Sequence, residues 1–251
     1  MDNYNLGFID DDMIFEHVKK TVQKYRFSIS LKEFNKNLID PIKLTFDAEI
    51  YGKSIEDIIL TECMRQIDKS NSNHIGYFHQ NLFQHISPDW EVPKQGFDVV
   101  NKKKCIFAEI KNKHNTMNSS SSQKTYMRMQ AQLLKNNQSL CFLVEVIAKN
   151  SQNVPWIISL DGQQTQHPNI CRVSIDQFYT IVTGDAMAYQ KLCANLPRII
   201  HDAVVSLDIL NAITNTVLEE LSDISDDFLT SLYMMAFEKY QGFDSFHIKP
   251  E

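Results

Sequence analysis

Two carboxylates and one lysine in the middle of the chain are spaced so that they can share one face of a β-hairpin. Residues 96–100 hold Asp98, and residues 105–111 hold Glu109 and Lys111; apolar and polar side chains alternate at 97–99 and at 108–111. Such alternation is typical of half-buried strands, and the polar, lysine-rich step between them predicts a hairpin turn. With the turn centred on that step, Asp98 faces Glu109 with Cβ atoms about 4.5–5.5 Å apart.

This pairing points to a bound cation. Two like charges directly opposite each other destabilise a sheet, and a divalent cation between them would remove the repulsion. Mg²⁺ suits such a site because it typically takes one or two protein carboxylates, with water and substrate phosphate completing its coordination. Lys111 alternates onto the same face, where its ammonium group could orient an attacking water or stabilise charge on a phosphate. Asp98, Glu109 and Lys111 together predict a Mg²⁺-dependent phosphodiester hydrolase.

Charge and patterning favour this chemistry over a surface hairpin with ordinary solvated charges, although the spacing alone also occurs by chance. We expect the opposite, apolar face of the hairpin to consist of Phe97, Val99, Ile106, Ala108 and Ile110. The net charge is −6, but residues 94–135 carry nine lysines and arginines against two acids. Residues 201–251 carry ten acids and two lysines. Such asymmetry matters more than the sum, so the basic middle predicts a nucleic-acid partner.

The elements that must position these residues form a mixed α/β pattern. Apolar residues at helical spacing predict helices at residues 55–68, 74–86 and 124–134, with polar loops expected at 70–73 and 112–123. The almost continuously apolar run at 140–148 predicts a buried central strand. We therefore expect one α/β domain over residues 1–251, with a central mixed β-sheet flanked by helices and helical additions at both ends.

The composition argues against several other classes of protein. Five scattered cysteines fit reduced thiols in a cytoplasmic protein better than a disulfide framework or a zinc site. No apolar run reaches the roughly 18 residues that cross a bilayer, so no membrane partner is expected. The absence of a glycine-rich phosphate loop argues against a nucleotide cofactor.

The residues around the hairpin resemble a known nuclease family. Asp98, followed by Glu109 and Lys111 at the end of a hairpin strand, looks like the PD-(D/E)xK nuclease core. The stretches 97–100 (FDVV) and 108–122 (AEIKNKHNTMNSSSS) are similar to the Eco47II/Sau96I-type family of type II restriction endonucleases, which cut GGNCC. One departure is Phe97, which stands where the motif has proline; the literal Pro-Asp pair at residues 88–89 falls in a predicted turn.

The resemblance implies a PD-(D/E)xK core over about residues 74–200, with helical additions at 1–73 and 201–251. It implies cleavage of double-stranded DNA at a short palindromic site with Mg²⁺ as the cofactor, leaving 5′-phosphate and 3′-hydroxyl ends. Asp98 and Glu109 match the metal-binding acids, and Lys111 matches the catalytic lysine. A palindromic site and one such triad per chain predict a homodimer with two-fold symmetry.

Other polar residues near the triad are weaker candidates. Asparagine can read adenine and lysine can read guanine, while hydroxyl groups and cations bind phosphates. Candidate DNA contacts on this basis are Asn112, Lys113, His114, Asn115, Ser119, Lys124 and Arg128. Gln80 and Glu62, on the preceding helices, are candidate accessory residues of the metal site. For each of them a solvated loop or helix face is the alternative.

Two other functions fit the same residues. A repair or junction-resolving nuclease on the same core would keep the metal dependence but lose sequence-specific fragments. A non-catalytic DNA-binding protein would bind DNA without cutting it, and removal of the Asp98 charge would leave that binding unchanged or strengthen it.

Overall fold

The computed structural model describes residues 4–160, 162–209 and 214–238, and their contacts divide the chain into two compact units. Of the described residues, unit 1 comprises 4–23, 75–160 and 162–209, and unit 2 comprises 24–74 and 214–238. Each unit has its own buried hydrophobic cluster. That the whole chain acts as a single nuclease domain stays a prediction.

Unit 1 is built on a five-stranded mixed sheet, as the apolar patterning predicted. Its strands run in the order β2 (Val99–Asn101), β3 (Ile106–Lys113), β4 (Leu140–Ile147), β8 (Ile170–Ser174) and β5 (Asn153–Pro155). The three central strands are mutually parallel, and the two edge strands are antiparallel to their neighbours. A small hairpin, β6 (Ile158–Leu160) with β7 (Gln163–Thr165), lies outside this sheet.

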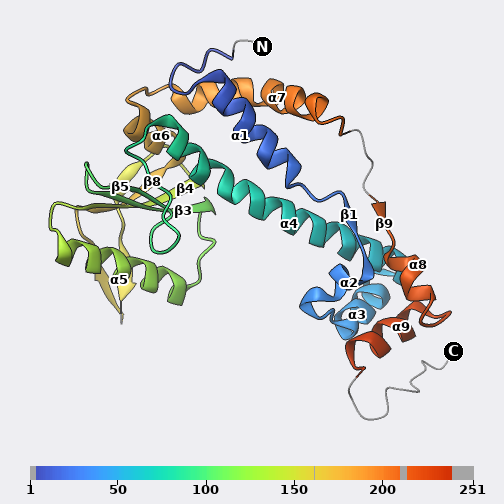
Figure 1. Ribbon diagram of the computed structural model, residues 1–251. Helices are drawn as coiled ribbons and strands as arrows, with labels where there is room; N and C mark the ends of the chain where they lie inside the picture. The colour runs from blue at the N-terminus through green and yellow to red at the C-terminus, as the bar shows by residue number, and fades with distance from the viewer. Residues whose placement is uncertain (1–3, 161, 210–213, 239–251) are drawn as a thin grey trace. The chain divides into compact units, whose positions relative to one another are not determined.

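Helices cover both faces of the sheet (Figure 1). Helix α5 (Ser119–Lys135) lies on one face, where Tyr126 and Met129 are buried against Leu143 of β4. On the other face α6 (Ile175–Thr183) packs on β4 and β8, supported by α1 (Asp11–Gln23), α7 (Ala188–Ser206) and the end of α4 (Ile55–Ile86). Because side chains alternate along a strand, Ala108 and Ile110 of β3 enter this second core, and Glu109 points to the α5 face.

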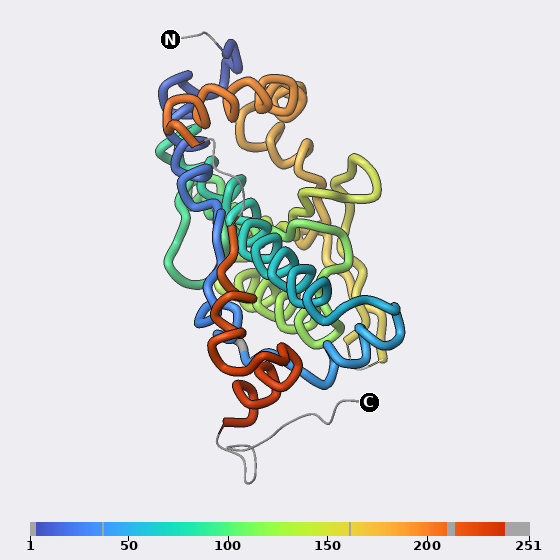
Figure 2. The backbone as a smooth tube through the Cα atoms, turned by 90° about the vertical axis from the view of Figure 1, so that its right-hand side faces the viewer, coloured from blue at the N-terminus to red at the C-terminus, as the bar shows by residue number. Residues whose placement is uncertain are grey.

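Unit 2 is mainly helical and joins two distant segments of the chain. Its elements are β1 (Ser28–Ile29), α2 (Leu31–Phe34), the 3₁₀ turn η1 (Asn35–Asn37), α3 (Pro41–Tyr51), the start of α4, β9 (Thr214–Asn215), α8 (Val217–Ser222) and α9 (Phe228–Ala236). Strands β1 and β9 pair in parallel and run side by side in Figure 2. The core of this unit contains Phe34, Ile59 and Leu232.

The predicted loop at residues 70–73 is wrong, and the predicted loop at 112–123 is shorter at both ends than expected, because β3 reaches Lys113 and α5 begins early. Residues 70–73 belong to α4, which is continuous from Ile55 to Ile86. This segment contains no glycine or proline, and Asn71 accepts a hydrogen bond from the backbone N–H of Arg26 (2.8 Å), so a tertiary contact supports the helix there. Helix α5 begins at Ser119 instead of Lys124, because Asn118 caps it by accepting from the backbone N–H of Ser121 (2.9 Å).

In the described parts of the chain, no helix is long and apolar enough to cross a membrane.

Candidate active site

The hairpin has the predicted register and brings Asp98 next to Glu109. Val99 is paired with Ala108 on the neighbouring strand. Asp98 lies one residue before β2, and its Oδ2 accepts the backbone N–H of Ile110 at 2.8 Å. The Asp98 side chain thus accepts a hydrogen bond from the residue that follows Glu109 on β3.

Glu109 is held by two cations on the α5 face of the sheet. Its side chain is only 10% exposed, and its Oε1 accepts from the Lys111 ammonium at 2.8 Å. Its Oε2 pairs with Arg128, which comes from α5. Arg128 also donates to the carbonyl of Gly96 (2.9 Å) and stacks on the ring of Phe97 at 5.1 Å. The phenylalanine in the proline position of the motif therefore supports the arginine that pairs with Glu109.

The electrostatics of Asp98 show that the two carboxylates repel each other. Burial, and then the charge of Glu109, raise the pKa of Asp98 above its ordinary value. The N–H of Ile110 and the charges of Lys111 and Arg128 oppose this rise. Among the described residues, no cluster of three or more histidine, cysteine or acidic side chains could hold a metal ion. Asp98 and Glu109 could offer two carboxylates to a cation, the number that Mg²⁺ typically takes from a protein.

A cavity of about 500 Å³ opens beside Glu109 and Lys111. Glu109 and Lys111 contribute its β3 side. The β3–α5 connection and α5 contribute the rest, with Thr116, Met117, Ser121, Lys124, Thr125 and Arg128. Of the candidate DNA contacts, Lys124 and Arg128 therefore lie together with Glu109 and Lys111. Lys113 and Ser119 are exposed, and Asn112 is half-buried; none of these three lines the cavity.

A second ionic cluster lies next to Lys111, on the same face of the sheet. Glu145 of β4 is the strand partner of Lys111 and is almost completely buried. It accepts from Arg172 of β8 (2.8 Å), and both of its oxygens lie 3.0 Å from Nδ1 of His114. Arg172 also donates to Oδ1 of Asn115 (3.2 Å). Of the candidate DNA contacts, His114 thus binds Glu145 of β4, and Asn115 binds Arg172 of β8.

Sequence reasoning missed Glu145 and Arg172. A signal for the first was available, because Glu145 is the one charged residue in the apolar run 140–148. A carboxylate buried in a central strand requires a partner. The identity of that partner depends on the parallel pairing of β4 with β8, which local patterning does not reveal.

Neither of the two accessory candidates is among the residues that line the cavity. Gln80 is half-buried on the last part of α4, where Phe78, Leu82 and Phe83 pack into the core on the sheet face opposite α5. Glu62 lies in unit 2, where Arg65 and Gln66 bind its carboxylate. Burial raises the pKa of Glu62, but the hydrogen bonds from these two side chains outweigh it, and the net shift is downward. An accessory role for either residue stays a prediction.

Comparison with known proteins identifies the family. The sequence profile described as "Eco47II restriction endonuclease" matches residues 6–205. The type II restriction enzyme Sau96I of Staphylococcus aureus is 33% identical over 214 residues, covering 80% of this chain and 82% of that enzyme. The type II restriction enzyme Eco47II of Escherichia coli is 29% identical over 208 residues, covering 78% and 87%. The chain therefore belongs to the Eco47II restriction endonuclease family, the site-specific type II deoxyribonucleases that act on double-stranded DNA.

Proposed function

We propose that this restriction endonuclease cuts double-stranded DNA at GGNCC, with Mg²⁺ as its cofactor and with Asp98, Glu109 and Lys111 as its catalytic residues. The observation that supports this most is the hairpin geometry. It places Asp98 beside Glu109 through the hydrogen bond from Ile110, and Glu109 and Lys111 line a cavity within a basic part of the chain. The GGNCC site follows from the sequence resemblance. The proposal includes a homodimer, because a palindromic site presents two equivalent strands to two triads. It also places the enzyme in the cytoplasm.

Asp98 and Glu109 are the residues that would hold the metal. Asp98 offers Oδ1, which makes no hydrogen bond to any residue that the structure describes. Glu109 pairs through one oxygen with Lys111 and through the other with Arg128, so a bound Mg²⁺ would replace at least one of these two cations at the carboxylate. A bound Mg²⁺ would supply Lewis acidity toward the phosphate and would lower the pKa of a coordinated water.

Lys111 acts on the nucleophile and the phosphate. Its side chain is 30% exposed and lines the cavity, so it can reach a phosphodiester that enters from solvent. The ammonium group positions the attacking water and stabilises the charge that builds on the phosphoryl oxygens. In-line attack then expels the 3′-oxygen and leaves 5′-phosphate and 3′-hydroxyl ends. Lys124, exposed on α5, lines the other side of the same cavity and contacts the DNA backbone.

Digestion of a defined plasmid tests the specificity. Purified protein is incubated with 5–10 mM Mg²⁺ (roughly the usual working range for a weakly held ion) or with EDTA, and the fragment ends are sequenced. We expect discrete fragments ending within GGNCC with Mg²⁺ and none with EDTA. Discrete fragments at another sequence would discard GGNCC and keep the mechanism. A smear of unspecific ends would contradict the proposal.

A further inference from the structure

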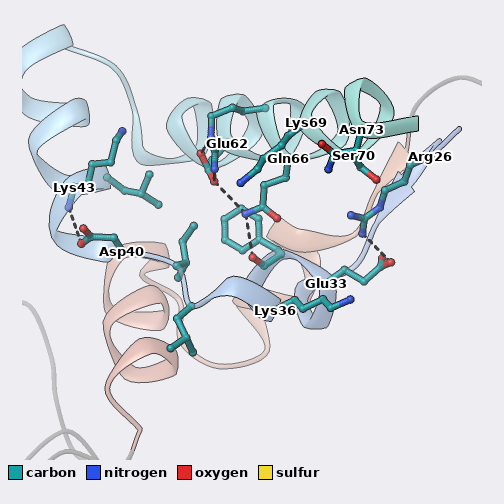
Figure 3. A pocket seen from close by; sticks show the side chains of 15 residues that line it. Arg26, Glu33, Lys36, Asp40, Lys43, Glu62, Gln66, Lys69, Ser70 and Asn73 are labelled. Carbon is teal, nitrogen blue, oxygen red and sulfur yellow. Dashed lines mark hydrogen bonds and ion pairs between the residues drawn. The ribbon is translucent and has the colours of Figure 1, made fainter. Parts of the chain in front are cut away.

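Unit 2 contains a polar cavity that the cleavage reaction does not use. Its volume is about 460 Å³. One wall is the first part of α4, which presents Glu62, Arg65, Gln66, Lys69, Ser70 and Asn73, and the opposite wall runs from α2 to the start of α3 (Figure 3). Its apolar lining is recessed: Phe34 is completely buried, and its carbonyl accepts from Gln66 (3.0 Å).

Positive charge gathers at this cavity. Residues 24–74 carry eight lysines and arginines and eight acids. Five of these cations line the cavity, against three of the acids. The cations are Arg26, Lys36, Lys43, Arg65 and Lys69, and the acids are Glu33, Asp40 and Glu62. The lining therefore carries two more cations than acids within a neutral segment; Lys43 is paired with Asp47, which does not line the cavity, and one excess positive charge remains when Asp47 is counted.

Each of the three carboxylates already has partners inside unit 2. Glu33 binds Arg26 at 2.8 Å, and Glu62 is bound by Arg65 and Gln66. Asp40 caps α3 by accepting the backbone N–H of Lys43 at 3.1 Å. These acids are therefore not free to receive a cationic ligand. The described residues also contain no acidic cluster that could hold a metal ion.

Two lysines remain available on opposite walls. Lys36 and Lys69 are exposed and form no ion pair with any residue that the structure describes. Figure 3 shows Lys69 on α4, next to Ser70, and Lys36 on the other side of the cavity. Ser70 and Asn73 add neutral donors beside Lys69, and hydroxyl, amide and ammonium groups are the usual protein ligands of phosphate oxygens.

We propose that this cavity binds a phosphate group of the DNA backbone, as a contact separate from the catalytic triad. The proposal rests on the assignment of this chain as an enzyme that acts on DNA. The lining has no exposed aromatic side chain among the described residues on which a base could stack, so the contact is independent of sequence. A backbone phosphate fits because it needs only cations and neutral donors.

The test is the salt dependence of binding to a duplex that lacks GGNCC. The double variant Lys36→Gln/Lys69→Gln is compared with Lys24→Gln/Lys53→Gln, which removes two exposed lysines of the same unit outside the cavity. Each lost phosphate contact lowers the slope of log affinity against log salt by about 0.9, so loss of the one phosphate held by both lysines lowers it by about 0.9. The affinity at moderate salt should fall by roughly tenfold. Lys36→Arg/Lys69→Arg should keep the wild-type slope.

The outcomes separate this inference from the proposed function. A cavity variant whose slope and affinity equal those of the control would overturn the inference while plasmid cleavage by the wild type stands. A wild type that neither binds nor cuts DNA would instead refute the function itself. If inorganic phosphate raises the melting temperature of the wild type but not of the cavity variant, and duplex binding is unchanged, the cavity takes a free anion and the proposal is wrong. Melting curves of all variants check that they fold.

Discussion

Removal of the buried charge of Glu145 should destabilise unit 1 far more than removal of an exposed ion pair. The Glu145 side chain is only 2% exposed and accepts from Arg172 at 2.8 Å. In Glu145→Gln the guanidinium of Arg172, which is 23% exposed, loses its counter-charge. Loss of one partner of a buried ion pair costs about 3–5 kcal/mol, and partial exposure of the arginine favours the lower end. At about 2–4 °C per kcal/mol, the melting temperature should fall by roughly 6–12 °C.

The assay is urea unfolding of Glu145→Gln beside a matched control. Glu91→Gln breaks the exposed pair with Lys102, in which both side chains are about half exposed or more, and should cost at most about 1 kcal/mol. Arg172→Met alone should also be costly, but adding it to Glu145→Gln should add little, because the partner is already lost. The reasoning is refuted if Glu145→Gln behaves like Glu91→Gln, or if the effects of Glu145→Gln and Arg172→Met are simply additive.

Three further effects follow from local environments. Burial, and then His17, lower the pKa of His79 from 6.5 to about 4. The neutral imidazole therefore contributes its full stability above pH 6.5, and the free energy of unfolding should fall by about 2 kcal/mol between pH 7 and pH 5. His79→Gln should reduce this pH dependence in urea unfolding. Burial raises the pKa of the Cys141 thiol to about 12, so iodoacetamide at pH 8 should alkylate exposed Cys193 long before Cys141. Mass spectrometry measures the two labelling rates, and equal rates would contradict this prediction. Gly184 ends α6 with a φ of +77°, so Gly184→Ala should cost about 1–2 kcal/mol in urea unfolding, and a neutral effect would show that the left-handed cap is not required.

The hairpin could be predicted from the sequence because its order is local. Alternation of apolar and polar residues fixed the faces, and the short polar step fixed the register that pairs Val99 with Ala108. The strand at residues 140–147 was predictable for a similar reason, since its apolar run is long and continuous. The placement of Asp98 beside Glu109 followed from the alternation and the register of the hairpin.

What escaped prediction depends on contacts between distant segments. The bonds of Glu145 arise from the parallel neighbours of β4, and Arg128 reaches Glu109 across the loop from α5. Residues 70–73 read as a loop by composition, but tertiary contacts in unit 2 keep them helical. The pairing of β1 with β9 joins residues nearly two hundred positions apart, and no local sequence pattern predicts it.

The central claim is that Asp98, Glu109 and Lys111 catalyse phosphodiester cleavage. Its most direct test is the single-turnover rate of Asp98→Asn and Lys111→Met on a DNA duplex with one GGNCC site, beside Lys104→Met from the hairpin turn. We predict that both site variants lose at least about 100-fold in rate while their binding to the same duplex in EDTA stays within a few fold, and that Lys104→Met cuts like the wild type. Site variants that cleave at the wild-type rate would contradict the account.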